Sequence, residues 1–493
     1  MSQLQKLAGQ TAIYGLSSIV GRLLNYLLVP IHTRVFVTSD FGTISEMYAY
    51  VAFLIVILTY GMETTFFRFT IDNDKKSVYS TSLISLFFTS FFFVAVSTIF
   101  AQPIASAIRY PNNSEYIIYF ALIISLDALS SVPFAKLRQE NKAKKFVIVK
   151  VVGIGVNIFF NLFFLLLCPY LYKHNIMPDF VNLVFKGKVG VGYVFIANLI
   201  SSIATIIILL PEMLRINFKF DFSLWKKMMP YALPLLIVGL AGNVNETMDR
   251  ILLKYLLPRN ISMHELGIYG ACYKISIMMT IFIQAFRFAA EPFFFSNSQK
   301  ENAKNLYADV MKYFVIICSF IFLVITLYID IVKYFIGEDY FSGLKIVPIL
   351  LLANMFLGIY FNLSIWYKLT DKTQFGSYLS IFGAAITLVL NFIFIPVYGY
   401  MASAWATFLC YFSMMVISYF IGQKYYKIPY NLIKIIGYLL FAVLVYGVSY
   451  FISEYFKPNV LSLKLIVNTL LLGVFIIVVF MFERKMKSVV SSQ

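Results

Sequence analysis

Long apolar segments follow one another along nearly the whole chain, and short polar linkers separate them. A bilayer core about 30 Å thick needs about 20 helical residues to cross it, which is the length of these segments. The pattern therefore predicts an all-α integral membrane protein with about 14 transmembrane helices. The predicted spans are 11–31, 43–67, 78–101, 115–135, 146–168, 190–210, 230–254, 267–290, 308–329, 344–367, 376–396, 400–422, 432–452 and 461–482.

The composition supports a chain that lies mostly within the membrane. Of its 493 residues 60% are hydrophobic and 13% are charged, whereas a soluble domain carries about 25% charged residues. The net charge of +17 could suggest a nucleic-acid partner, but Lys and Arg also collect at the cytoplasmic ends of spans. Basic residues in alternate linkers outnumber those in the opposite set by roughly two to one. We therefore predict no nucleic-acid partner, cytoplasmic termini and a first span that acts as an uncleaved anchor.

Candidate metal and nucleotide motifs are weak. The four cysteines lie in or at the ends of apolar segments without a CxxC pair, and the three histidines lie near helix ends, so no metal or other cofactor is predicted. Asp72-Asn73-Asp74 has the D-x-D form that glycosyltransferases use to hold a metal–nucleotide sugar. In a short polar loop, however, this sequence is more typical of a solvated turn. The chain has no P-loop, which argues against direct use of ATP.

Two short motifs indicate an internal duplication. Arg34-Val35-Phe36 is followed by Asp40-Phe41-Gly42, and Arg250-Ile251-Leu252 is followed by Glu265-Leu266-Gly267. Both pairs read as basic-apolar-apolar, a loop, and then acidic-apolar-glycine. A parallel repeat of six spans is a recurrent transporter design, with a cavity between the two halves. The predicted organisation is an N-terminal lobe (1–212), a C-terminal lobe (213–424) and a C-terminal helix pair (425–493).

Several short motifs, taken in their order along the whole chain, indicate a resemblance to a known family. They are the first helix from Gly15 to Pro30, the two acidic-apolar-glycine motifs, the segment from Asn245 to Arg250, and Pro396-Val397-Tyr398-Gly399. With the fourteen-span layout, the chain resembles the oligosaccharide-lipid flippases of the multidrug/oligosaccharidyl-lipid/polysaccharide exporter superfamily. These are the O-antigen and capsule repeat-unit flippases, and their lobes alternate in access to the two sides of the membrane.

The resemblance implies a specific transport role. The substrate would be an undecaprenyl-pyrophosphate-linked oligosaccharide, which moves from the cytoplasmic to the periplasmic leaflet of the bacterial inner membrane, driven by a proton or cation gradient. The resemblance also implies that the protein is a monomer in contact with membrane lipid. It implies a role in the biosynthesis of lipopolysaccharide or another polysaccharide, with a polymerase and other assembly proteins as partners. Two alternatives stay open: a multidrug or cation antiporter of the same superfamily, and a membrane glycosyltransferase or polymerase.

Charged residues inside the spans are the candidate functional residues. A charge at the centre of a span costs about 2.5–3.5 kcal/mol, so such residues are expected to face a watery cavity or one another. Arg and Lys suit an anionic pyrophosphate, and nearby acids suit proton or cation uptake. The predicted substrate-binding residues are Arg22, Lys150, Arg250, Lys274 and Arg287, and the predicted ion-coupling residues are Glu46, Glu63, Asp127, Glu246 and Asp249.

Plainer interpretations compete with these roles. Arg287 and Glu291 are one helical turn apart and can pair, and Lys150 can extend to the cytoplasmic surface. Asp249 and Arg250 are adjacent, so they are expected to point to different faces rather than pair. Prolines 230 and 234 are expected to interrupt or bend the seventh predicted span, which would make it a moving part.

Overall fold

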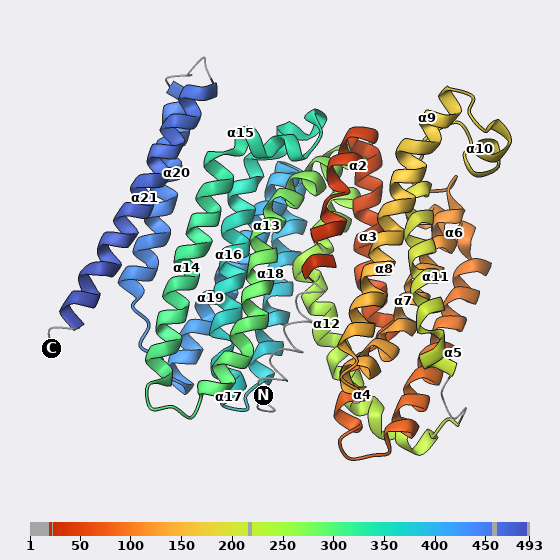
Figure 1. Ribbon diagram of the computed structural model, residues 1–493, viewed down its shortest axis with the longest axis horizontal. Coiled ribbons are helices and arrows are strands. Elements are labelled where there is room, and N and C mark those ends of the chain that lie inside the picture. Colours follow the sequence, from red (N-terminus) through yellow and green to blue (C-terminus); the bar gives the residue numbers. More distant parts are fainter. Residues whose placement is uncertain (1–18, 22, 215–218, 456–460, 491–493) are drawn as a thin grey trace. The chain divides into compact units, whose positions relative to one another are not determined.

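Each apolar segment from residue 43 onward forms a helix, as the hydropathy pattern predicts (Figure 1). The computed structural model describes residues 19–21, 23–214, 219–455 and 461–490. Within these residues, 13 helices are long and apolar enough to cross a membrane. The prediction of an all-α, multi-pass membrane protein is therefore confirmed. The chain divides by its packing into two units, residues 1–267 and 268–493, while the predicted lobe boundaries at 212 and 424 stay a prediction.

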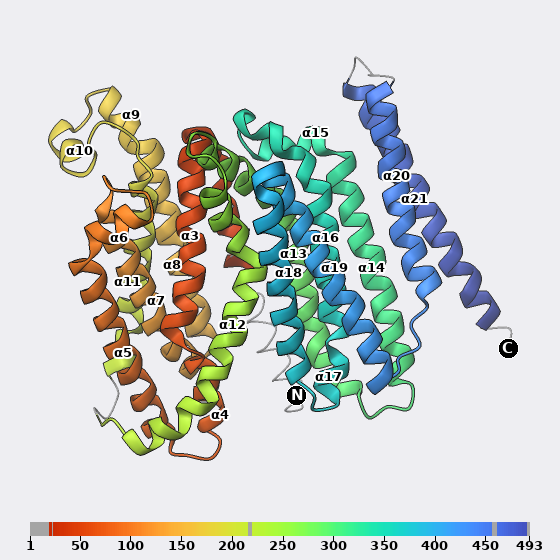
Figure 2. The same ribbon diagram turned by 180° about the vertical axis from the view of Figure 1, so that it is seen from behind.

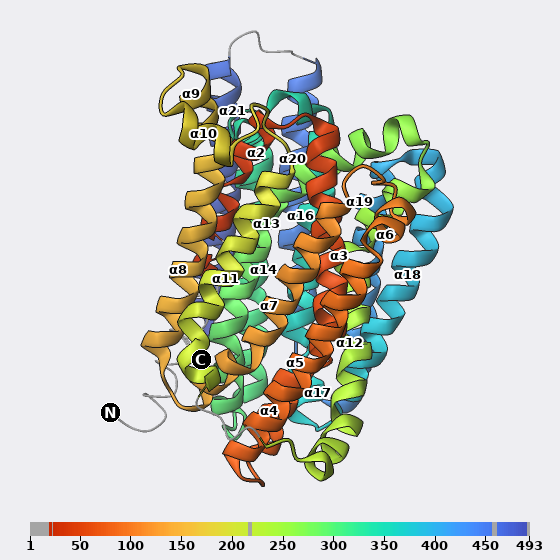
Figure 3. The same cartoon turned by 90° about the vertical axis from the view of Figure 1, so that its right-hand side faces the viewer.

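The first unit is held together by packing between its long helices, several of which are distant in sequence. In it α5 packs on α7, α11 packs on both α7 and α8, and α3 packs on α12. Figure 3 shows α8 rising to α9 and the short α10. Its helices are α2 (Val29–Val35), α3 (Thr38–Thr59), α4 (Met62–Phe69), α5 (Lys75–Ile99), α6 (Ala101–Ala107), α7 (Ser114–Gln139), α8 (Ala143–Leu162), α9 (Cys168–Lys173), α10 (Pro178–Val184), α11 (Gly192–Leu214), α12 (Phe222–Leu256) and the start of α13 (Arg259–Asn297).

The second unit contains most of α13 and all later helices. In it α19 packs on α16 and α18, and α14 packs on α16 and α20; Figure 2 shows these helices from behind. Two 3₁₀ segments, Lys333–Phe335 and Glu338–Ile346, connect α15 to α16. The helices are α14 (Ala303–Leu327), α15 (Ile329–Val332), α16 (Val347–Leu363), α17 (Ile365–Leu369), α18 (Gln374–Tyr398), α19 (Tyr400–Tyr425), α20 (Leu432–Tyr455) and α21 (Leu461–Val490).

Charged groups hold the last helix, α21, to α14 and α20 near one end and to α15 near the other. Near its C-terminal end, the Glu483 carboxylate lies 2.8 Å from the ammonium groups of both Lys312 and Lys434. Near its N-terminal end, the Lys464 ammonium lies 2.5 Å from Asp330, the second residue of α15. Ionisable residues in membrane proteins usually pair with one another, and these pairs join α21 to its neighbours near both of its ends.

One expectation about helix continuity differs from the structure. The seventh span was expected to be interrupted or bent at Pro230 and Pro234. The interruption is wrong, because α12 runs unbroken through both prolines, while the bend stays a prediction. Its N-terminus is capped by Asp221, whose carboxylate accepts a hydrogen bond from the Leu224 amide at 2.9 Å. In membranes, prolines are tolerated inside helices because neighbouring groups satisfy the freed carbonyls.

The first predicted span, 11–31, is only partly described. Residues 19–21 and 23–26 are helical, and a turn at 27–28 separates them from α2. Pro30 lies in the first turn of α2, where its missing N–H leaves no helical hydrogen bond unmade. Arg22, the deepest cation predicted to bind substrate, lies outside the described residues.

Candidate functional site

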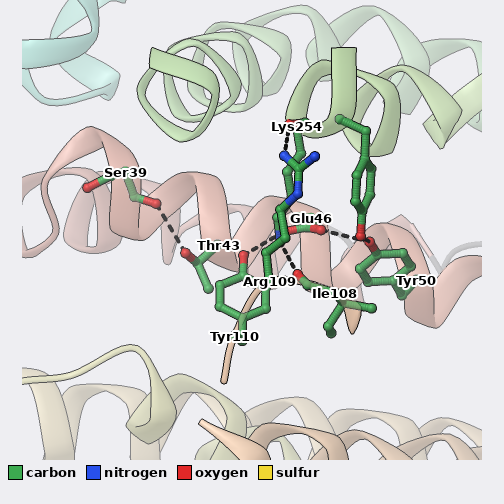
Figure 4. Close-up of polar contacts among 9 residues, drawn as sticks. Ser39, Thr43, Glu46, Tyr50, Ile108, Arg109, Tyr110 and Lys254 are labelled. Atoms are coloured by element: carbon green, nitrogen blue, oxygen red, sulfur yellow. Dashed lines mark hydrogen bonds and ion pairs between the residues drawn. The ribbon is translucent and has the colours of Figure 1, made fainter. Parts of the chain in front are cut away.

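A buried ion pair joins two helices of the first unit. Glu46 of α3 and Lys254 of α12 lie 2.8 Å apart, Oε2 to Nζ, with side chains 0% and 3% exposed (Figure 4). Taking both charges out of water is costly unless the pair has good geometry and further hydrogen bonds. A pair this deeply buried therefore needs further hydrogen-bond partners.

The surroundings satisfy both charges. The Tyr50 hydroxyl donates to Glu46 Oε1 at 2.8 Å, and the Tyr110 hydroxyl donates to Oε2 at 2.5 Å. Lys254 Nζ also donates to the Ile108 carbonyl at 2.6 Å. Tyr110 lies in the loop between α6 and α7, where burial, and then the Glu46 charge, raises the pKa of its phenol. This phenol therefore stays protonated and remains a donor to the carboxylate.

Arg109 closes the same cluster from the loop side. Its backbone is in the left-handed region, with φ at 64°, which is an uncommon conformation for residues other than glycine. This turn directs the guanidinium to donate to the Lys254 carbonyl at 3.0 Å, and it lies 4.7 Å from the centre of the Tyr255 ring. The Tyr255 and Tyr50 hydroxyl oxygens are 3.0 Å apart. We call Glu46, Tyr50, Arg109, Tyr110, Lys254 and Tyr255 the Glu46 cluster.

Sequence reasoning found only one member of this cluster. Glu46 was predicted to couple ions, but Lys254 stands at the end of the predicted span 230–254, where a lysine is typical of an interface. Arg109 stands in a predicted outer linker. The ammonium of Lys254 meets a carboxylate 208 positions away, and no local signal encodes that contact.

The two acidic-apolar-glycine motifs contact each other at a crossing of α3 and α13 within the first unit. A Cβ on Gly42 would overlap the Met263 carbonyl oxygen, and a Cβ on Gly267 would overlap the Thr38 carbonyl oxygen. The contacts are reciprocal, since Thr38 and Met263 each stand four residues before their own glycine. Only glycine allows two backbones to approach this closely. His264 adds a side-chain contact, with Nδ1 2.6 Å from the Thr38 hydroxyl oxygen.

A cationic pocket lies in the second unit between α13 and α16–α17. Arg287 and Lys368 line it together with Glu291, which lies 2.6 Å from Lys368 and 3.9 Å from Arg287. Arg287 therefore does pair with Glu291, and its guanidinium also lies 4.7 Å from the centre of the Phe361 ring. Two cations share one carboxylate, which leaves the pocket with one positive charge.

The same pocket contains a polar group without a protein partner. Asn362 is 3% exposed, and its Nδ2 has no hydrogen-bond partner among the described residues. A buried amide N–H left unpaired costs about 1–3 kcal/mol, so it indicates a missing acceptor. The open space is about 20 Å³. A larger anion would therefore enter only if the side chains that line the pocket moved apart.

The other predicted residues lie apart from this pocket. Lys150 lies over the Phe134 ring at 4.3 Å, and Asp127 accepts a hydrogen bond from Ser202 at 2.8 Å. Glu63 forms an ion pair with Arg138. Lys150 and Arg250 belong to the first unit and Lys274 and Arg287 to the second. Three of the predicted substrate-binding residues, Lys150, Arg250 and Arg287, thus have different neighbours in the structure. Lys274 is half-buried on α13.

The expectation that Asp249 and Arg250 do not pair is wrong. Asp249 is buried, and its carboxylate accepts a hydrogen bond from the Arg250 backbone amide at 2.8 Å. The Arg250 guanidinium lies 3.9 Å from the same carboxylate and donates to the Glu246 carbonyl at 2.9 Å. A long arginine side chain folds back along its own helix, so adjacent positions can meet even though their Cβ atoms diverge. The Glu246 side chain is exposed.

The Asp72-Asn73-Asp74 motif forms a turn between α4 and α5. Asp72 pairs with Arg68 at 2.5 Å, and Asp74 caps α5 by accepting from the Ser77 amide at 2.9 Å. Among the described residues, no group of three or more His, Cys, Asp or Glu side chains could hold a metal ion. Both carboxylates thus have local structural partners.

We expect the Asp72→Asn variant to change the free energy of unfolding by no more than about 1 kcal/mol, because an exposed ion pair contributes about 0–1 kcal/mol. Asp74→Ala should lower the free energy of unfolding by about 0.5–2 kcal/mol through the lost cap. Thermal unfolding in detergent checks both. A larger loss of stability in Asp72→Asn than in Asp74→Ala would contradict the turn interpretation.

Comparison with known proteins places the chain in a family. Residues 7–298, more than half of the chain, match the family described as "Polysaccharide biosynthesis protein". No curated protein sequence matches the chain significantly.

Solved structures share the fold at low sequence identity. The lipid II flippase MurJ, in an inward closed conformation, has a TM-score of 0.71 and 14% identity, covering 96% of this chain and 99% of that one. An inward-facing multidrug resistance MATE family transporter of the MOP superfamily has a TM-score of 0.64 and 14% identity, covering 84% and 97%. A mutant of the Vibrio cholerae MATE transporter VcmN has a TM-score of 0.53 and 12% identity, covering 86% and 96%. These structures show a shared fold, and the family match shows that the chain belongs to the polysaccharide biosynthesis protein family.

Proposed function

We propose that the chain is a flippase for a polyprenyl-pyrophosphate-linked oligosaccharide, which it moves from the cytoplasmic to the periplasmic leaflet by alternating access. In this proposal it lies in the bacterial inner membrane as a monomer with cytoplasmic termini, supplying a polysaccharide polymerase. Family membership and the fold shared with MurJ and MATE transporters support it. The glycan, whether O-antigen, capsule or another, is the finer part of the proposal.

The observation that carries the proposal is the cationic pocket of Arg287 and Lys368. A lipid pyrophosphate is anionic, and a guanidinium can bind two of its oxygens at once while an ammonium adds a point charge. Glu291 holds both cations until the anion arrives, and the Asn362 amide offers a further donor. The headgroup would take the place of Glu291 beside Arg287 without leaving either charge unpaired.

The Glu46 cluster would supply the coupling to a proton or cation gradient. An ion taken up at the Glu46 carboxylate would compete with Lys254 for its negative charge, and a buried, unpaired ammonium is strongly disfavoured. The protein would then favour a conformation in which Lys254 reaches water. Release of the ion on the other side would restore the pair.

Reconstitution tests the function directly. Vesicles containing the purified protein and a fluorescent polyprenyl-pyrophosphate oligosaccharide are expected to expose the probe to an impermeant quencher faster than protein-free vesicles. Transport of a cationic dye instead, with no movement of the lipid, would support the multidrug or cation antiporter. Glycosyl transfer by the purified protein would support the membrane enzyme.

Removal of a pocket cation is expected to slow this transport. Arg287→Ala and Lys368→Ala should each lower the initial rate about tenfold or more, since a charge-assisted hydrogen bond is worth about 1.5–3 kcal/mol. Arg68→Ala is the matched control, because that arginine forms an exposed pair with Asp72. Equal rates for Arg287→Ala and Arg68→Ala would contradict a role of the pocket in binding the headgroup.

A further inference from the structure

A second cavity in the first unit has a different chemistry. It measures about 220 Å³ and lies between α3, α5, α6 and α7. Its walls are aliphatic and aromatic side chains, among them Leu54, Ile108 and Ile124. Of the residues that line it, only Tyr50 and Ser97 carry a polar side chain.

Water is a poor occupant of this cavity. At about 30 Å³ per molecule the space would hold about seven waters, and each needs two to four polar partners. The Tyr50 hydroxyl is already engaged by Glu46 and by Tyr255. One serine hydroxyl cannot satisfy a cluster of that size, so the walls favour an apolar occupant.

The membrane supplies such an occupant beside the cavity. On α5, Phe88 and Phe92 are 64% and 70% exposed, as expected for side chains that face lipid. Phe93, the next residue, and Ser97, one turn further, line the cavity. The helix that forms one wall of the cavity therefore also carries side chains that face lipid.

We propose that this cavity binds part of one hydrocarbon chain of a bilayer phospholipid. The chain packs against Tyr50, whose hydroxyl donates to Glu46, and against Ile108, whose carbonyl accepts from Lys254. The occupant thereby supports two of the residues that hold the buried ion pair. The inference does not depend on the proposed substrate, because it needs only a lipid bilayer around the protein.

Photolabelling with a phospholipid that carries a diazirine on its acyl chain tests the proposal. The reconstituted protein is irradiated, and the modified residues are located by peptide mass spectrometry. We expect adducts on the interior residues Leu54 and Ile124 in addition to adducts on the lipid-facing Phe88 and Phe92. The lipid-facing adducts are an internal control for folding and insertion.

Blocking variants make the result specific. Ala121→Phe places a ring in the cavity and should reduce the Leu54 and Ile124 adducts about tenfold while those on Phe88 and Phe92 remain. Ser97→Leu blocks the cavity from another helix and should act alike. Ala107→Phe makes the same change at an exposed alanine of α6 and should leave all adducts in place.

Three outcomes would overturn the proposal. Unlabelled Leu54 and Ile124 in the unaltered protein would show that no acyl chain enters. Adducts that persist in both blocking variants would place the chain elsewhere. Loss of these adducts on addition of polyprenyl phosphate, but not of the same amount of unlabelled phospholipid, would assign the cavity to an isoprenoid tail instead.

Discussion

Replacement of Gly267 by alanine is expected to lower transport to less than about a tenth of the unaltered rate, because overpacking a tight contact costs about 1–3 kcal/mol. The added Cβ would overlap the Thr38 carbonyl oxygen, which belongs to the backbone of α3 and cannot rotate away. The helices α3 and α13 would have to separate at their crossing. Gly42→Ala is expected to act in the same way through the Met263 carbonyl.

Gly242→Ala is the matched control for these two variants. This glycine also lies within a long helix, but a Cβ added there would meet nothing within 4 Å. Alanine favours a helix over glycine by about 0.5–1 kcal/mol, so this variant should transport normally and unfold at an equal or higher temperature. Normal transport in Gly267→Ala and Gly42→Ala would show that transport does not need the close crossing.

Removal of Lys254 alone is expected to lower the free energy of unfolding by about 3–5 kcal/mol, because Lys254→Met leaves Glu46 buried without its cation. The double variant Glu46→Leu, Lys254→Met should recover most of that loss, since apolar residues of similar size often replace a buried pair without a penalty. Thermal unfolding of the purified variants measures both effects.

Measuring the transport rate of the same variants distinguishes a role of the Glu46–Lys254 pair in ion coupling from a role in stability. If Glu46 carries the coupling proton, the double variant should move the lipid at a rate that no longer depends on an imposed pH gradient. Arg68→Met, which breaks an exposed pair, should change neither stability nor gradient dependence by a measurable amount. A stable double variant that still responds fully to the gradient would remove the Glu46 cluster from the coupling mechanism.

Hydropathy predicted the fold because the membrane requires long apolar helices wherever the chain crosses it. The ends of the spans were harder to predict. The span predicted at 267–290 is the middle of α13, Arg259–Asn297, since a helix continues into the interface where polar residues are tolerated. The short helices α6 and α10 were missed, because seven residues give no clear hydropathy signal.

The site was less accessible to sequence reasoning than the fold. The two glycine motifs could be recognised as a repeat, but their mutual contact joins positions more than 200 residues apart. Glu46 was selected as an acid inside a span, while its partner Lys254, the last residue of the predicted span 230–254, was not among the candidate residues. Lys368, which shares Glu291 with Arg287, stood in a predicted cytoplasmic linker. Such pairings depend on how helices that are distant in sequence pack together. Neither the hydropathy pattern nor the order of charged residues along the chain predicts that packing.

The ion pairs at the two ends of α21 limit how the chain can be shortened. A protein truncated before this helix would keep Lys312 on α14, largely buried, without the Glu483 that neutralises it. It would also expose to lipid the part of α14 that α21 now covers. A twelve-span descendant of this protein would therefore need new residues along α14 before it could lose its last two helices.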